Sequence, residues 1–185
     1  MNFARRLLYG LAPGILLSSL VTGCKPADSP DVHAKSSPPP PPADKPLHLD
    51  HAQPKLLTVK LWAGPEILVT EVAATQTEIA TGMMFRKEMK ENEGMLFVFP
   101  RPYQIAFYMK NTSIPLSAGY IGSDGTLLEI HDLVPLDETP VPANSDQVQF
   151  VLEVNQGWFE RHKIKVGTVA RTEFGSLQES FFRRR

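Results

Sequence analysis

Two runs of residues, Leu116–Ile121 and Thr126–Leu133, stand on either side of the short segment Gly122-Ser-Asp-Gly125. Glycine and aspartate tolerate the backbone angles of a tight turn, and both flanking runs have the length and apolar content of strands. This pattern predicts an antiparallel hairpin. It favours a fold dominated by an antiparallel sheet, because hairpins of this kind join neighbouring strands of such sheets.

Further strands are predicted on both sides of the hairpin. Leu56–Trp62 alternates polar and apolar residues, whereas Gly94–Phe99 is a continuous apolar run closed by Pro100, typical of a buried strand. The predicted strands outside the hairpin are 56–62, 66–74, 94–99, 104–111, 148–154 and 168–171. The pattern predicts an α+β fold with a curved, mainly antiparallel sheet, or a barrel-like one.

Two short helices are predicted beside these strands. Thr75 and Glu78 fit a capping box, in which each side chain bonds the backbone of the other, and Gly82 soon ends that helix. A helical turn is predicted over Gly157–His162. Both helices are too short to form a layer of their own, so the sheet supplies most of the core.

The N-terminal residues have the features of a bacterial lipoprotein precursor. Arg5 and Arg6 precede the mostly apolar run 7–20, which is too short to span a bilayer comfortably. The run ends in Leu-Val-Thr-Gly-Cys24, which resembles a lipobox, and Cys24 is the only cysteine. Residues 1–23 are therefore predicted to be a signal peptide and Cys24 to be lipidated. The alternative is an ordinary secretory signal with a chance cysteine.

The lipid on Cys24 is the predicted contact with the membrane, in an exported protein that faces the periplasm. In lipoproteins of two-membrane bacteria, an aspartate after the lipidated cysteine favours retention in the inner membrane. Lys25 stands at that position here. Its presence favours the outer membrane.

Composition divides the rest of the chain into three parts. Residues 24–54 are proline-rich, with Pro38–Pro42 in one run, and such a segment cannot bury enough apolar surface to fold. We interpret it as a disordered spacer, although a proline run can also bind an aromatic groove. His48, Asp50 and His51 are interpreted as solvated linker residues rather than metal ligands. Residues 55–175 are the predicted globular domain and 176–185 a tail.

The charge balance excludes one class of partner. The chain has 19 basic and 20 acidic residues, which gives a formal net charge of -1. A nucleic-acid-binding domain usually carries a marked basic excess. We therefore expect no nucleic-acid partner, and instead a small anionic ligand or another envelope protein.

Four sequence blocks resemble the family known as domain of unknown function 192. The blocks are Gly82–Arg86, Gly94–Phe99, Phe107–Leu116 and Leu152–Trp158. The family has no agreed activity, so the resemblance implies a fold and an exported location more than a reaction. Two departures are visible: Tyr108 replaces the family's usual tryptophan, and Ser117 replaces its usual aspartate.

A candidate site follows from these blocks. On a strand over 104–111, alternation would bring Tyr108, Lys110 and Thr112 to one face, with Asn111 beside them and Arg86 approaching from the first block. Such a group suits an anion or an anionic envelope sugar, held by charge-assisted hydrogen bonds. The alternative is that the two cations are ordinary surface residues and that Asn111 and Thr112 shape a turn.

Two other functions stay open. Five of the six methionines lie between Met83 and Met109, which suits copper(I) but also plain core packing. An envelope hydrolase or transferase would use the candidate residues together with His131 or Glu153. The sequence has no Gly-x-Ser-x-Gly elbow, phosphate loop or zinc signature, and it implies no cofactor. These observations favour a non-catalytic binding or accessory domain.

Overall fold

A computed structural model of the chain describes residues 47–183. The elements are β1 (Thr58–Ala63), β2 (Glu66–Ala73), α1 (Gln76–Thr81), β3 (Glu93–Tyr103), β4 (Ala106–Phe107), β5 (Leu116–Gly122), β6 (Leu127–Leu133), β7 (Val141–Pro142), β8 (Val148–Asn155), α2 (Trp158–Arg161), β9 (Ala170–Thr172), β10 (Gly175–Ser176) and α3 (Leu177–Phe182). The predicted signal peptide, Cys24 and most of the predicted linker lie outside the described residues.

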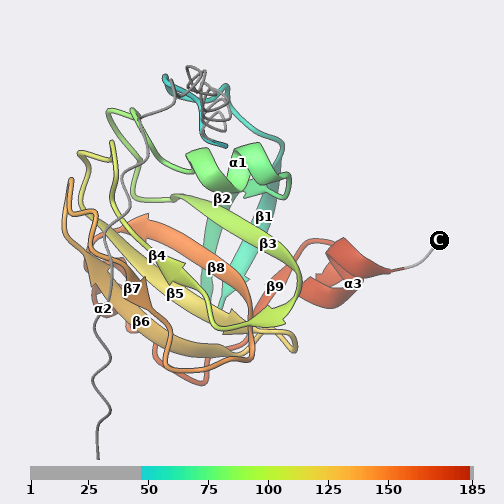
Figure 1. Cartoon of the computed structure of the whole chain (residues 1–185). Helices are drawn as coiled ribbons and strands as arrows, with labels where there is room; N and C mark the ends of the chain where they lie inside the picture. Colours follow the sequence, from blue (N-terminus) through green and yellow to red (C-terminus); the bar gives the residue numbers. More distant parts are fainter. Residues whose placement is uncertain (1–46, 184–185) are drawn as a thin grey trace, which may run out of the picture. The chain divides into compact units, whose positions relative to one another are not determined.

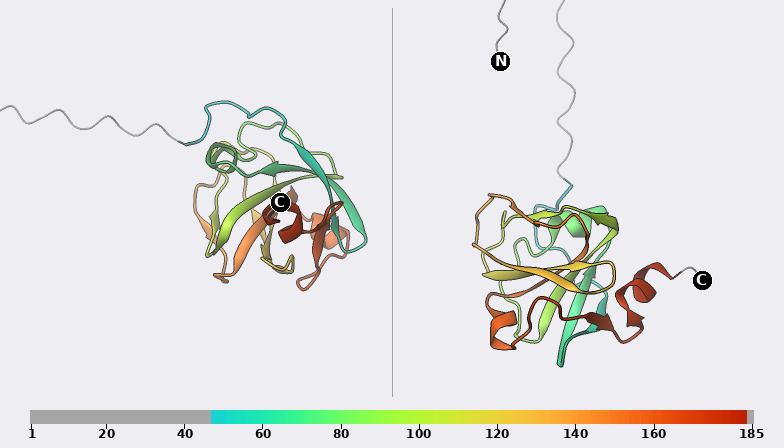
Figure 2. Two further views of the ribbon diagram at one scale, coloured as in Figure 1. Left: turned by 90° about the vertical axis from the view of Figure 1, so that its right-hand side faces the viewer. Right: turned by 90° about the horizontal axis from the view of Figure 1, so that it is seen from below.

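Eight strands form one strongly curved sheet in the order β10-β9-β1-β2-β3-β8-β5-β6 (Figures 1 and 2). Strands β2 and β3 pair in parallel through the crossover that contains α1, and the other pairs are antiparallel. The prediction of an α+β fold with a curved, mainly antiparallel sheet is confirmed. The sheet does not close into a barrel, although Gly167, Thr168 and Ala170 hydrogen-bond residues 125–127 near the start of β6.

Side chains from the sheet alternate between two apolar cores. On β3, Leu96 and Val98 belong to one core cluster, whereas Met95 and Phe97 belong to the other. Strand β8 contributes to both clusters because it lies in the middle of the sheet, between β3 and β5. Both faces of β8 are therefore buried, which explains its nearly continuous apolar sequence.

The helix predicted from the capping box is present. Thr75 caps α1 through the backbone N–H of Glu78, and the Glu78 carboxylate accepts from the Thr75 N–H in return. Gly82 ends the helix with a φ of 47°. A Cβ at this position would lie 3.1 Å from the ring of Phe97, so both the backbone angle and the close approach require glycine here.

One predicted strand is wrong in its extent. The segment 104–111 was expected to be extended, but β4 covers only two of its residues and pairs with β7 in a separate ribbon. The chain then turns, because Met109 donates to Asp137, Thr112 donates back to Met109, and Asn111 has a φ of 54°. Strand alternation therefore does not govern where the side chains of residues 108–112 lie.

Contacts at both ends of the described chain extend beyond the predicted domain of residues 55–175. The buried Gln53 donates to the carbonyls of Glu78 and Gly82, so residues predicted to be linker fasten the end of α1. At the other end, the predicted tail contains a third helix, α3, whose Leu177 is fully buried. Phe181 and Phe182 pack against Phe150. The apolar side of α3 thus completes one of the two cores.

Candidate functional site

A cavity of about 240 Å³ lies between the end of α1, strand β3 and the segment 105–112. Its lining residues are Ile79, Ala80, Thr81, Gly82, Met83, Met84, Phe97, Phe99, Tyr103, Ile105, Ala106, Phe107, Tyr108, Thr112 and Glu153. Each of the four blocks that carry the family resemblance contributes to this wall. Residues far apart in the sequence therefore converge on one small, mostly apolar space.

Glu153 is the one acidic residue in this lining, and it is buried. Only 4% of its surface is exposed, and Oε2 has no hydrogen-bond partner within residues 47–183. Burial raises the pKa of the carboxyl to about 8, because water that would stabilise the charge is excluded. At neutral pH Glu153 is therefore a neutral carboxylic acid, able both to donate and to accept a hydrogen bond toward the cavity.

Glu153 is the deeply buried end of the cavity, and two tyrosines form its exposed end. Its strand β8 pairs on one side with Met95 of β3 and on the other with Ala118 of β5, which fixes the carboxyl at the floor. Tyr103 and Tyr108, by contrast, are about two-fifths exposed and form the rim. The cavity thus has an open apolar entrance and a polar group at its base.

Two residues with left-handed backbone angles belong to segments that line the cavity. Phe85 and Asn111 have φ angles of 63° and 54°, which strain the bulky Phe85, whereas asparagine adopts this region readily. The two residues are joined, because the Phe85 N–H donates to the Asn111 carbonyl over 2.8 Å. Strain of this kind tends to gather where a site must hold a fixed shape. This bond ties the segment after α1 to the segment after β4, and both segments line the cavity.

The structure separates the residues predicted as an anion site. Tyr108 and Thr112 line the cavity, whereas Arg86, Lys110 and Asn111 do not. Thr112 is buried, and its hydroxyl donates to the Lys110 carbonyl. The Asn111 amide lies 4.0 Å from the sulfur of Met84 and supports the wall from behind.

Both predicted cations have carboxylate partners. Arg86 forms two hydrogen bonds to Glu71, of 3.2 and 3.0 Å, in a largely buried pair. Lys110 lies 3.8 Å from Glu138 in an exposed pair. These contacts match the alternative interpretation of the sequence, in which Arg86 pairs with an acid and Asn111 shapes a turn. An anion site at Arg86 and Lys110 stays a prediction, and the two side chains do not meet in the cavity.

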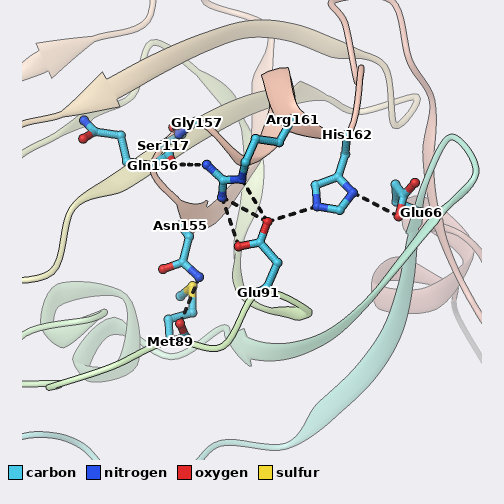
Figure 3. Close-up of polar contacts among 9 residues, drawn as sticks. All are labelled: Glu66, Met89, Glu91, Ser117, Asn155, Gln156, Gly157, Arg161 and His162. Carbon is cyan, nitrogen blue, oxygen red and sulfur yellow. Dashed lines mark hydrogen bonds and ion pairs between the residues drawn. The ribbon is translucent and has the colours of Figure 1, made fainter.

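A second polar cluster joins α2 to the segment before β3 (Figure 3). The Glu91 carboxylate accepts from Arg161 at 3.0 Å and lies 3.1 Å from His162, whose other ring nitrogen lies 3.2 Å from Glu66. These side chains are partly exposed and satisfy one another. We interpret the cluster as a surface clamp on α2, because it leaves no buried group in need of a ligand.

Ser117, which replaces the family's usual aspartate, lies beside a carboxylate. Its hydroxyl is 2.5 Å from Asp132, its cross-strand partner on β6, and it accepts from the Gly157 N–H at 2.9 Å. A carboxylate on the neighbouring strand β6 therefore lies directly across from Ser117. Asp132 lies outside the Glu153 cavity.

The residues proposed for catalysis or metal binding are dispersed. His131 lies beside Glu129 on β6 and does not line the Glu153 cavity, so the two candidate acid–base residues do not share a site. Of the five clustered methionines, Met83 and Met84 line the cavity, while Met95 and Met109 are core residues. No group of three His, Cys, Asp or Glu side chains suited to a metal occurs within residues 47–183.

Comparison with known proteins gives a family match that covers all four sequence blocks. The family model for DUF192, described as "Uncharacterized ACR", matches residues 59–172. The chain belongs to the DUF192 family. The predicted resemblance is therefore confirmed. Comparison with the curated proteins gives no match.

Two solved structures are similar to this DUF192 chain. A protein of unknown function from Novosphingobium aromaticivorans is 37% identical over 63% of this chain and 84% of its own, with a TM-score of 0.58. A Sinorhizobium meliloti protein described as a "putative transcription regulator" is 32% identical over 62% of this chain and 92% of its own, also with a TM-score of 0.58. These relatives share the fold.

Proposed function

We propose that the chain is an exported lipoprotein whose DUF192 domain binds a small ligand, without catalysis, in the cavity above Glu153. The observation that carries this proposal is the buried carboxyl of Glu153, a residue that lines an open cavity and whose Oε2 has no partner within residues 47–183. A buried polar atom without a partner destabilises the folded protein by about 1–3 kcal/mol. A ligand that satisfies the carboxyl recovers this free energy on binding, which gives the cavity a specific recognition element.

The lining restricts the chemistry of the ligand. Among the described residues that line the cavity, none is lysine, arginine or histidine, so an anion would find no counter-charge there. The volume is below the roughly 300–1,000 Å³ of pockets that hold drug-sized molecules, so the ligand is small. We propose a largely apolar molecule with one polar group that reaches Glu153.

The envelope location is proposed from the lipobox-like sequence that ends at Cys24. Two or more acyl chains on that residue would anchor the protein stably, whereas one would not. No helix within residues 47–183 is long and apolar enough to cross a membrane. We propose that the domain faces the periplasm, from the outer membrane.

Nucleic-acid binding is a weaker candidate. The description of the Sinorhizobium protein belongs to that relative, and in this chain 20 acidic residues balance 19 basic ones. Binding to phosphates depends on an excess of clustered cations. We therefore propose no nucleic-acid partner.

A thermal-shift screen of the full chain tests the binding proposal. The panel contains small apolar alcohols, amines and amides, together with anionic sugars as the contrasting class. A ligand at 100 times its dissociation constant stabilises a folded protein by about 2.7 kcal/mol. We expect stabilisation by a non-anionic compound that Glu153→Gln weakens and that Glu88→Gln, at an exposed control position, leaves unchanged. Stabilisation only by anions, unaffected by Glu153→Gln, would overturn the proposed site.

Substitution of Cys24 tests the anchor. Cys24→Ala is expected to abolish incorporation of a radiolabelled fatty acid and to release the protein from the membrane fraction. Persistence of the variant in that fraction, with no label, would contradict anchoring through the lipid.

A further inference from the structure

The walls of the Glu153 cavity are unusually aromatic. Five of the lining residues carry aromatic rings: Phe97, Phe99, Tyr103, Phe107 and Tyr108. Phe97 meets Phe107 at 83° with ring centroids 4.8 Å apart, and Phe99 meets Tyr103 at 89° and 5.5 Å. Two pairs of nearly perpendicular rings therefore bound the space, and the thioethers of Met83 and Met84 complete the lining.

We propose, on the basis of the binding role proposed above, that the ligand is a small organic cation of the alkylammonium class. Its charged head would lie among the aromatic rings, and the Glu153 carboxylate would be its counter-ion. The uncharged remainder of the molecule would point out of the cavity at its rim.

The electrostatics of the wall support a cation. Aromatic faces carry partial negative charge and attract ammonium groups, by about 2 kcal/mol or more where water is excluded. Polarisable methionine sulfur packs well against the methyl groups of such a head. The described lining holds no lysine, arginine or histidine that would repel the cation or neutralise Glu153 in its absence.

Proton balance follows from the state of Glu153. In the empty cavity the carboxyl is protonated at neutral pH. When a permanent cation binds, the Glu153 O–H bond breaks, the proton passes to solvent, and the carboxylate keeps the electron pair as counter-ion. The other titratable groups in the lining are Tyr103 and Tyr108. Tyr120 of β5 packs against the lining residue Phe107. Burial raises the pKa of both Tyr103 and Tyr120, so both stay neutral.

A matched pair of probes isolates the charge. Choline and 3,3-dimethylbutan-1-ol have nearly the same shape, but only choline is charged. Isothermal titration calorimetry on the full chain, in buffers of different ionisation enthalpy, measures both affinity and proton release. Choline affinity is expected to rise about tenfold between pH 6 and 7 and to level off as the pH approaches 8, with close to one proton released at the lower end. Affinity for the alcohol is not expected to rise.

Variants separate this inference from the proposed function. Glu153→Gln is expected to abolish choline binding and proton release and only to weaken binding of the uncharged alcohol, whereas Glu88→Gln changes neither. Tyr108→Leu, at the exposed rim and therefore safe for folding, is expected to weaken choline binding by roughly threefold or more.

Three outcomes decide the assignment. Equal binding of choline and the alcohol, without proton release, would overturn the cation while leaving a neutral ligand for the cavity. Failure of both choline and tetramethylammonium to bind would also overturn it. In that case hits from the broader panel would still support the binding role, and a panel without any hit that depends on Glu153 would overturn the binding role as well.

Discussion

Two glutamates of the same sheet have opposite surroundings. The Glu129 carboxylate on β6 accepts from the Asn144 and Ser145 N–H groups and from the Asn144 side chain, at 2.8–3.0 Å, and lies 2.9 Å from His131. Glu153 on β8 is more deeply buried, and its Oε2 has no partner within residues 47–183.

The pKa values of the two carboxyls express this difference. Burial acts to raise the pKa of Glu129, but the hydrogen bonds from Asn144, His131 and Ser145 outweigh it and lower that pKa to about 2. At Glu153 burial acts alone and raises the pKa to about 8. We infer that Glu129 is a structural group that fixes the loop after β7, whereas Glu153 keeps its bonding capacity for a ligand.

Removal of the satisfied carboxylate is expected to have the largest effect. Glu129→Ala leaves the backbone donors of Asn144 and Ser145 without their acceptor and breaks the contact with His131. Loss of one partner from such a network destabilises a protein by up to about 3 kcal/mol. Urea denaturation measures the change in the free energy of unfolding. A loss below about 1 kcal/mol would show that Glu129 does not hold the loop.

Removal of the unsatisfied carboxyl is expected to act in the opposite direction. Glu153→Met retains similar volume and removes the buried polar group, so the free energy of unfolding should rise by about 1–3 kcal/mol at neutral pH. Ligand binding should be lost in the same variant. A destabilised Glu153→Met protein would contradict the claim that this carboxyl is unsatisfied in the empty domain.

The pH dependence of stability should also differ in sign. Glu153 has a folded pKa of about 8, above its ordinary 4.5. Its contribution to the free energy of unfolding is therefore complete below pH 4.5 and is lost as the pH rises toward 8. Glu129 has a folded pKa of about 2, below 4.5, so its contribution is present above pH 4.5 and is lost as the pH falls toward 2.

Denaturation at a series of pH values separates these two contributions. Between pH 4.5 and 8, Glu153 should lower the free energy of unfolding by about 1.4 kcal/mol per pH unit. Glu153→Gln should flatten this slope without changing the acid limb that Glu129 produces. An unchanged slope in the variant would assign the pH dependence to other groups.

The smallest effect is expected at an exposed pair. Lys110 lies 3.8 Å from Glu138, and both side chains are more than a third exposed. Pairs of this kind contribute about 0–1 kcal/mol. Lys110→Ala should therefore change the free energy of unfolding by less than about 1 kcal/mol and leave the cavity intact. A loss of ligand binding in this variant would revive the predicted anion site.

Much of the fold could be predicted because local rules and tertiary packing agree. The capping box at Thr75 and the hairpin turn at Gly122–Gly125 both specify backbone geometry within a few residues. The strand predicted over 104–111 failed because Asn111 adopts a left-handed angle imposed by contacts with distant segments. Helix α3 was missed although a local signal was present, because Ser176 and Glu179 form a capping box like that of α1.

The site was harder to predict than the fold. Of the residues named from the sequence, Tyr108 and Thr112 line the cavity. Arg86 and Lys110 were chosen for their charge, and charge does not reveal a partner such as Glu71. Glu153 entered only as an acid in the enzymatic alternative. The available signal was a single acidic residue between Leu152 and Val154, in a strand whose other residues are apolar apart from Gln149 and Asn155.

Direct titration of the Glu153 carboxyl tests the central claim. In the full chain, the side-chain ¹³Cδ chemical shift of Glu153 can be followed by NMR from acid to alkaline pH, with Glu153→Gln used for assignment. The account predicts a midpoint near 8 in the empty domain, the value expected of a buried carboxyl without a partner. A midpoint near the ordinary 4.5 would mean that the carboxyl is hydrated or bonded, and would contradict its role as an unsatisfied anchor for a ligand.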